Sequence, residues 1–158
     1  MELRPYQEQA RQAIEKEWAS GVKNTLLVLP TGCGKTVVFS KVIEDQVKEG
    51  KRVLVMAHRG ELLDQAADKL HRMTGLTCAV EKADQSCLGT WNRVVVGSVQ
   101  SLMRPSRLAK FNKDYFDAII VDEAHHAVSD TYTRVLEHFD QANVLGVTAT
   151  PERSDMRK

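Results

Sequence analysis

Between Leu29 and Val38 the sequence LPTGCGKTVV places two glycines, a lysine and a threonine between an apolar run and a segment of helical character. Glycines let the backbone curl so that its N–H groups point inward, and the lysine and the N-terminus of the following helix supply positive potential. This pattern indicates a phosphate cradle. An ordinary strand-to-helix turn is the alternative, because Leu29 stands where the general pattern G-x-x-x-x-G-K-[ST] has its first glycine.

In the phosphate-binding interpretation, the backbone N–H groups from Gly32 to Thr36 hold the phosphates. Lys35 would reach the β- and γ-phosphate oxygens, and Thr36 would offer its hydroxyl group to Mg²⁺. Hydrolysis would also need a second metal ligand and a group that orients the attacking water. The phosphate-binding interpretation is therefore supported if such groups follow another strand.

A second polar cluster, IIVDEAHH, supplies such groups after the apolar run at 117–121. Asp122 could approach a metal ion beneath the phosphates, and Glu123 could polarise a water molecule aimed at the terminal phosphorus. The two carboxylates could instead cap the following helix. His125 and His126 raise the question of zinc, but no cysteine or histidine lies near them in sequence at zinc-ligand spacing.

Short apolar runs and amphipathic segments alternate along the whole chain. Few polar residues interrupt the runs, as expected for strands covered on both faces, and residues 5–19 and 61–73 carry apolar residues at helical spacing. This alternation predicts a mostly parallel sheet with helices on both faces, which places ligands beyond the C-terminal ends of the strands. The expected strands are 25–29, 52–57, 76–80, 93–97, 117–121 and 143–148.

Composition limits the class of protein. The 158 residues, 42% of them hydrophobic, suffice for one core of ordinary size, and the net charge of +1 argues neither for nor against a polyanionic partner. Three scattered cysteines suit a reducing compartment, and no stretch approaches 18 consecutive apolar residues. We expect a cytoplasmic domain over residues 1–150 without a membrane span, and the polar residues 151–158 as the start of a linker.

Three motifs, LPTGCGKT, VDEAHH and VTATP, occur in the order and approximate spacing of motifs I, II and III of superfamily 2 helicases and translocases. LRPYQ, VLVMAHRGELLDQ and VVVGSVQSL resemble further motifs of the same proteins. Over nearly its whole length the chain resembles their N-terminal lobe, in the branch of the XPB-like repair helicases and the motor subunits of type I and type III restriction enzymes. The resemblance implies a RecA-like P-loop NTPase domain that uses ATP and Mg²⁺.

The resemblance assigns roles within the nucleotide site. Glu123 would be the catalytic base, acting with Lys35 and Asp122. Gln7, together with Arg4, would recognise the adenine edge, although Gln7 could also be a solvated helix residue. The residues that hold the phosphates and Mg²⁺ would be Thr31, Gly32, Cys33, Gly34, Lys35, Thr36 and Asp122.

A further histidine would connect the nucleotide to the nucleic-acid surface. The resemblance implies that His125 links the nucleotide site to motif III, here Thr148 and Thr150. The two threonines could also be simple strand-end residues before Pro151.

Nucleic-acid contacts are expected where two loops follow strands. The resemblance places backbone contacts at Arg59 and Gly60 after one strand and at Ser98 and Gln100 after another. Basic residues at three-residue spacing could extend this track or could form a solvated face; they are Arg104, Arg107, Lys110 and Lys113.

Motors of this superfamily close two RecA-like lobes around ATP, and nothing after motif III resembles motifs IV to VI. An arginine finger from a second lobe contributes about 10³–10⁵ in rate. We therefore expect a monomeric ATP-binding lobe of a DNA helicase or translocase, with DNA favoured over RNA and the second lobe in the same parent chain. One alternative is a stand-alone nucleotide or nucleic-acid binding module. The other is a P-loop kinase or other phosphotransferase, but that interpretation would leave DEAHH and TATP without a purpose.

Overall fold

The computed structural model of the chain describes residues 3–30, 34–57, 63–81, 92–122 and 130–150. Within these residues, parallel strands form one six-stranded sheet in the order β1-β6-β5-β2-β4-β3. The parallel sheet expected from the sequence is confirmed. Its strands are β1 (Asn24–Pro30), β2 (Val53–Ala57), β3 (Cys78–Glu81), β4 (Val94–Ser98), β5 (Ala118–Asp122) and β6 (Asn143–Thr150).

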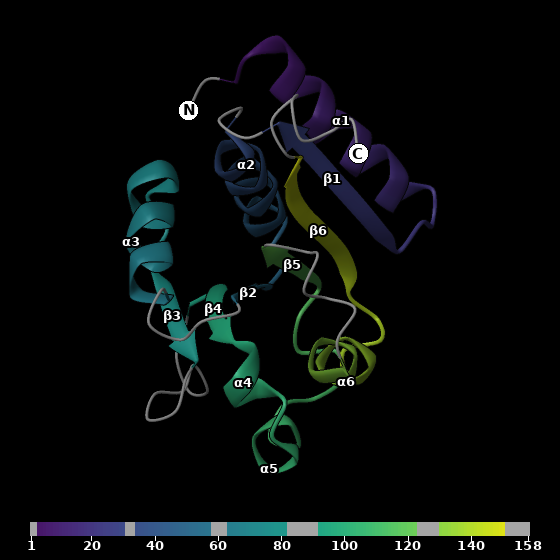
Figure 1. Cartoon of the computed structure of the whole chain (residues 1–158), viewed down its shortest axis with the longest axis vertical. Coiled ribbons are helices and arrows are strands. Elements are labelled where there is room, and N and C mark those ends of the chain that lie inside the picture. The colour runs from purple at the N-terminus through teal and green to yellow at the C-terminus, as the bar shows by residue number, and fades with distance from the viewer. Residues whose placement is uncertain (1–2, 31–33, 58–62, 82–91, 123–129, 151–158) are drawn as a thin grey trace.

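Helices cover both faces of the sheet (Figure 1). The first face carries α1 (Pro5–Ala19), α2 (Lys35–Lys48) and α3 (Leu63–Thr74). The second face carries α4 (Val99–Leu102), α5 (Pro105–Leu108) and α6 (Asp130–His138). In the part of the chain that the structure describes, no helix has the length and apolar character to cross a membrane.

Alternating side chains of the central strands pack into two separate hydrophobic cores. In β2, Val53 and Val55 pack with the helices of the first face, whereas Leu54 and Met56 pack with those of the second. All four side chains are buried. Because successive residues of a strand point to opposite faces, apolar runs without polar interruption are what a sheet covered on both sides requires.

A glycine in β4 lets the second layer approach closely. A Cβ at Gly97 would lie 2.7 Å from Leu102 Cδ1 and 3.2 Å from Leu54 Cδ1. Leu102 belongs to α4, which begins directly after β4 ends at Ser98. The absence of a side chain at Gly97 therefore allows the short helix to turn back onto the strand that precedes it.

Candidate functional site

The predicted phosphate and metal residues meet at the C-terminal edge of the sheet. α2 begins at Lys35, shortly after β1, and β5 ends at Asp122; β6 lies between these two strands. Lys35 Nζ lies 3.2 Å from Asp122 Oδ1, and the two side chains are 23% and 35% exposed. The fold thus joins two residues that are far apart in sequence, in a place that water and ligands can reach.

Thr36 and Asp122, the two residues expected to bind Mg²⁺, line one pocket of about 200 Å³. Its remaining wall comes from α2, β2 and α3, including Phe39, Val55 and Leu70. Among the described residues no group of three or more His, Cys, Asp or Glu side chains could hold a metal ion. One carboxylate and one hydroxyl group fit Mg²⁺, which usually keeps several waters and takes further ligands from phosphates.

The N-terminal helix lies against Gly34, the residue just before α2. Gln7 on α1 is only 5% exposed, and its Oε1 accepts a hydrogen bond from the backbone N–H of Arg4 at 2.9 Å. Gly34 has φ of +76°, and a Cβ there would lie 2.6 Å from Gln7 Nε2. The solvated alternative for Gln7 is therefore wrong: its amide packs against the last loop residue before α2.

Charged residues hold α1 in this place. Arg11 Nη1 lies 3.1 Å from Asp45 Oδ2 on α2 and 2.9 Å from Glu15 Oε1 on its own helix. Glu8 also pairs with Arg11, and this hydrogen bond raises the pKa of Arg11 and lowers the pKa of Glu8. The cluster fixes α1 on α2, about one helical turn away from the point where Gln7 meets Gly34.

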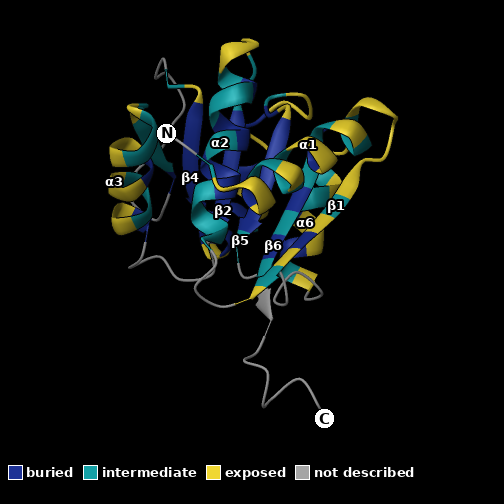
Figure 2. Ribbon diagram, turned by 90° about the horizontal axis from the view of Figure 1, so that it is seen from above, coloured by how far each residue is buried: buried dark blue, intermediate teal, exposed yellow. Residues whose placement is uncertain are grey.

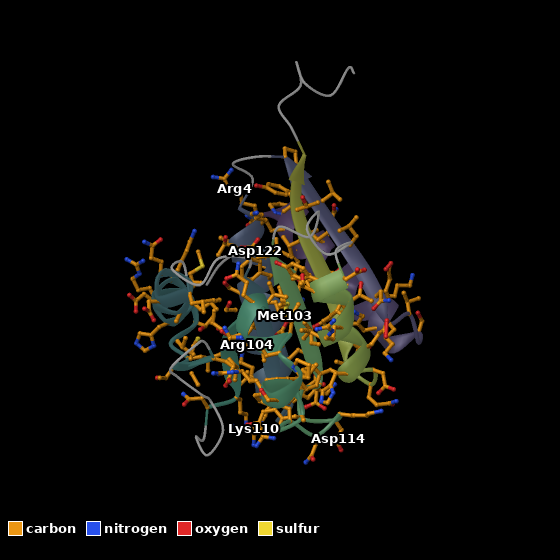
Figure 3. All side chains as sticks on the ribbon, turned by 60° about the horizontal axis from the view of Figure 1, so that its bottom comes forward. Arg4, Met103, Arg104, Lys110, Asp114 and Asp122 are labelled. Carbon is orange, nitrogen blue, oxygen red and sulfur yellow. The ribbon has the colours of Figure 1, made fainter. Side chains whose placement is uncertain are left out.

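The expected nucleic-acid residues that the structure describes differ in accessibility. Ser98 ends β4 and is 2% exposed, whereas Gln100 on α4 is exposed. Gln100 therefore presents its side chain at the surface, and Ser98 does not. Figure 3 shows Arg104 and Lys110 on the segment that follows, away from the end of the molecule where Arg4 and Asp122 lie.

The basic residues after β4 do not form one stripe. α5 ends at Leu108, so the three-residue spacing does not continue along a single helix. Arg107 Nη1 pairs with Glu81 Oε2 at the end of β3, and the Glu81 side chain is 1% exposed. Arg107 is thus used inside the fold, while Arg104, Lys110 and Lys113 are exposed.

The roles of the remaining predicted residues stay predictions. On the last described strand, Thr148 is half-buried and pairs in register with Val28 of β1, and Thr150 ends β6. The predicted residues that lie outside the described ones are Thr31, Gly32, Cys33, Arg59, Gly60, Glu123 and His125.

Sequence reasoning missed three charged residues that form ion pairs inside the fold. Arg11 and Asp45 gave no signal, because charged residues on amphipathic helices are usually solvated. Glu81 did give one, since it directly follows the apolar run at 76–80. A charge at the end of such a run can be buried only if a partner reaches it.

A parallel sheet with helices on both faces and a lysine and a carboxylate meeting at its C-terminal edge defines a nucleotide-binding lobe of the RecA-like class. The family model described as "Type III restriction enzyme, res subunit" matches residues 1–153, and the chain belongs to that family. The resemblance to the N-terminal lobe of superfamily 2 motors is confirmed.

Relatives and solved structures agree with this assignment. The chain is 36% identical to IRC3 of Saccharomyces cerevisiae over 98% of this chain and 24% of that protein. It is 30% identical to the DNA 3′-5′ translocase XPB2 of Sulfurisphaera tokodaii over 98% of this chain and 32% of that protein. The crystal structure of the Pyrococcus furiosus Hef helicase domain matches with a TM-score of 0.79 and 26% identity, over 94% of this chain and 33% of that one. The chain thus spans a quarter to a third of the length of these proteins.

Proposed function

We propose that the chain is the ATP-binding lobe of an ATP-dependent DNA helicase or translocase, and that Mg-ATP binds where α2 begins and β5 ends. The observation that carries the proposal is the contact between Lys35 Nζ and Asp122 Oδ1 at 3.2 Å. It brings a cation suited to phosphate and a carboxylate suited to Mg²⁺ to the edge of the sheet where parallel α/β folds bind ligands.

The two side chains would exchange partners when Mg-ATP binds. Lys35 would turn from the carboxylate of Asp122 to phosphate oxygens, and Asp122 and Thr36 would hold the metal. Neither charge would be left unpaired during this exchange, which keeps its cost low. Bound there, Mg²⁺ would neutralise charge that develops on the transferring phosphate.

We place adenine recognition at the N-terminal end of α1. Gln7 Oε1 accepts a hydrogen bond from the N–H of Arg4, and Gln7 Nε2 lies close to Gly34. A base whose phosphates lie in the loop would therefore meet an amide that is already oriented. Arg4 is exposed beside it and would complete the contact.

Hydrolysis would depend on residues beyond those that hold the nucleotide. We keep Glu123 as the base and His125 as the link to Thr148 and Thr150. A second RecA-like lobe in the same parent chain would supply the arginines, so residues 1–158 alone should bind ATP and hydrolyse it very slowly.

DNA is the proposed partner of Gln100, which is exposed, and of Arg59 and Gly60, whose roles stay predictions. The name of the relative XPB2, a DNA translocase, agrees with DNA as the partner. The exposed residues Arg104 and Lys110 lie on the segment after Gln100 and could add phosphate contacts. A cytoplasmic location also belongs to the proposal, because the three scattered cysteines of the sequence suit a reducing compartment.

Calorimetric titration of residues 1–158 with Mg-ATP tests the site. Replacing Lys35 by methionine should weaken binding by about 1.5–3 kcal/mol, because a charge-assisted hydrogen bond to phosphate is lost. Lys48→Met is the matched control, since Lys48 lies on the same helix and its side chain is 69% exposed. Equal affinities for the wild type and a folded Lys35→Met variant would remove Lys35 from the site.

A further inference from the structure

Two buried polar atoms near the C-terminal ends of α1 and α2 have no hydrogen-bond partner among the described residues. One is the indole Nε1 of Trp18 on α1, and the other is the amide Oε1 of Gln46 on α2, whose residue is only 6% exposed. Buried polar groups almost always find a partner, and each one left alone costs about 1–3 kcal/mol. A donor and an acceptor that both lack a partner therefore need an explanation.

Both side chains line the same pocket, which has a volume of about 310 Å³ and lies between the last turns of the two helices. Gln46 is about 16 Å along the axis of α2 from Lys35, at 1.5 Å per residue. The pocket is therefore separate from the nucleotide site. Its lining residues are Glu15, Trp18, Ala19, Gln46, Glu49, Lys51 and Asn143.

The turn after α2 satisfies the main chain of Gln46 but not its side chain. The backbone N–H groups of Glu49 and Lys51 both donate to the carbonyl oxygen of Gln46, each at 3.1 Å. The side-chain Oε1 lies beneath the pocket wall. The terminal torsion of a glutamine has a broad, shallow preference, so a rotation would bring this oxygen into the pocket.

The charges at the rim of the pocket already have partners. Glu15 Oε1 lies 2.9 Å from Arg11 Nη1, and Glu49 Oε1 lies 3.3 Å from Lys51 Nζ. The C-terminal ends of two helices also carry partial negative charge, which disfavours an anion. A neutral ligand would therefore fit this pocket without a counter-ion.

We propose that the pocket binds a neutral ligand through an amide group. The carbonyl oxygen of the amide accepts a hydrogen bond from Trp18 Nε1, and an N–H of the amide donates to Gln46 Oε1. A carboxylate has no proton to give to Gln46, and an ammonium group has no lone pair for the indole N–H. The pocket has room for about ten non-hydrogen atoms, at about 30 Å³ for each atom of the size of a water molecule.

The rim favours an amide over a hydroxyl group. An amide that pairs with Trp18 and Gln46 keeps a second lone pair and, if it is primary, a second N–H. The ammonium group of Lys51 and the carboxylates of Glu15 and Glu49 surround the same pocket and can take these up. A hydroxyl group has one proton and uses it on Gln46. The proposal does not depend on nucleotide binding, so the outcome of an ATP titration does not affect it.

The indole N–H signal of Trp18 in a ¹H–¹⁵N NMR spectrum of residues 1–158 tests the proposal. The sequence has two tryptophans, and Trp18→Phe identifies the signal by its loss. Titration with benzamide should move the signal downfield until it saturates. Benzoate, benzylammonium and benzyl alcohol carry the same ring and should give no saturable shift. Binding of N-methylbenzamide as well would assign the pocket to a peptide group, and binding of benzamide alone to a primary carboxamide; either result supports the proposal.

Gln46→Met keeps the length of the side chain and removes its amide. It should weaken benzamide binding at least about tenfold without lowering the free energy of unfolding, because the acceptor that it removes is unpaired. Gln12→Met is the matched control, since Gln12 is exposed on α1 and does not line the pocket. Absence of a saturable shift with benzamide would overturn the proposal, as would unchanged affinity in Gln46→Met. An equal response to benzyl alcohol would also overturn it and would show a site for water or a hydroxyl group only.

Discussion

Two ion pairs at the same edge of the sheet differ in how far water reaches them. Lys35 begins α2 and Asp122 ends β5, and their side chains are 23% and 35% exposed. Arg107 and Glu81, on α5 and at the end of β3, are 19% and 1% exposed. Both pairs join a basic residue of a helix to the last residue of a strand, so burial is the main difference between them.

This difference assigns the pairs to different tasks. An accessible ion pair contributes little to stability, about 0–1 kcal/mol, and its members can change partners. A buried carboxylate cannot lose its partner without a large penalty. The first pair is therefore suited to ligand exchange, and the second holds the segment after β4 against the edge strand β3.

The largest expected effect separates the two pairs by stability. Arg107→Met should lower the free energy of unfolding by about 3 kcal/mol, because the buried carboxylate of Glu81 loses this partner. Lys35→Met should lower it by less than about 1 kcal/mol. Urea unfolding of both variants measures the difference. Arg104→Met, at an exposed neighbouring position, is the control and should be neutral; similar losses for Arg107 and Lys35 would contradict the comparison.

Glycines in the two regions give the next test. Gly34→Ala places a Cβ at a residue with φ of +76° and 2.6 Å from Gln7 Nε2, so ATP binding should weaken by about 1–2 kcal/mol. Gly97→Ala crowds Leu102 and Leu54, and should instead lower the free energy of unfolding by about 1–3 kcal/mol.

A double-mutant cycle shows whether Gln7 contributes to the first effect. Adding Gln7→Ala to Gly34→Ala removes the crowding atom but leaves the unfavourable φ, so the two changes should be non-additive by about 0.5–1 kcal/mol. Calorimetric titration with ATP measures all four proteins of the cycle. Strict additivity would mean that the contact between Gln7 and Gly34 does not influence nucleotide binding.

The smallest expected effect has opposite signs with and without Mg²⁺. Asp122 competes with phosphate for Lys35, so Asp122→Asn should strengthen binding of metal-free ATP by about 0.5–1 kcal/mol. The same change should weaken binding of Mg-ATP and raise the Mg²⁺ concentration required, since a ligand of the metal is lost. Titrations in EDTA and in Mg²⁺ measure the two signs. Weaker binding in both conditions would show that the pair supports the site and does not exchange partners.

Much of the fold could be predicted from the sequence because the pattern of apolar residues within each segment indicates which of its faces are buried. The uninterrupted apolar runs required strands covered on both faces, and all six expected strands agree with the observed bounds within two residues. The run at 76–80 shifted to Cys78–Glu81, because Glu81 is buried through its pairing with Arg107. A pattern of hydrophobicity cannot predict which partner, 26 residues away, allows this charge to be buried.

The sequence by itself determined the chemistry at the strand ends: a glycine-rich turn with Lys35 and Thr36, and a carboxylate at Asp122. It could not determine how those ends meet. Only the strand order, with β6 between β1 and β5, brings Lys35 to Asp122, and only the packing of α1 on α2 places Gln7 against Gly34. The exposure of residues along β1 (Figure 2) could not be predicted either, since Leu26 and Val28 have the pattern of ordinary buried strand residues. Periodicity reports which residues avoid water, whereas the contacts that they make depend on the order in which distant segments pack.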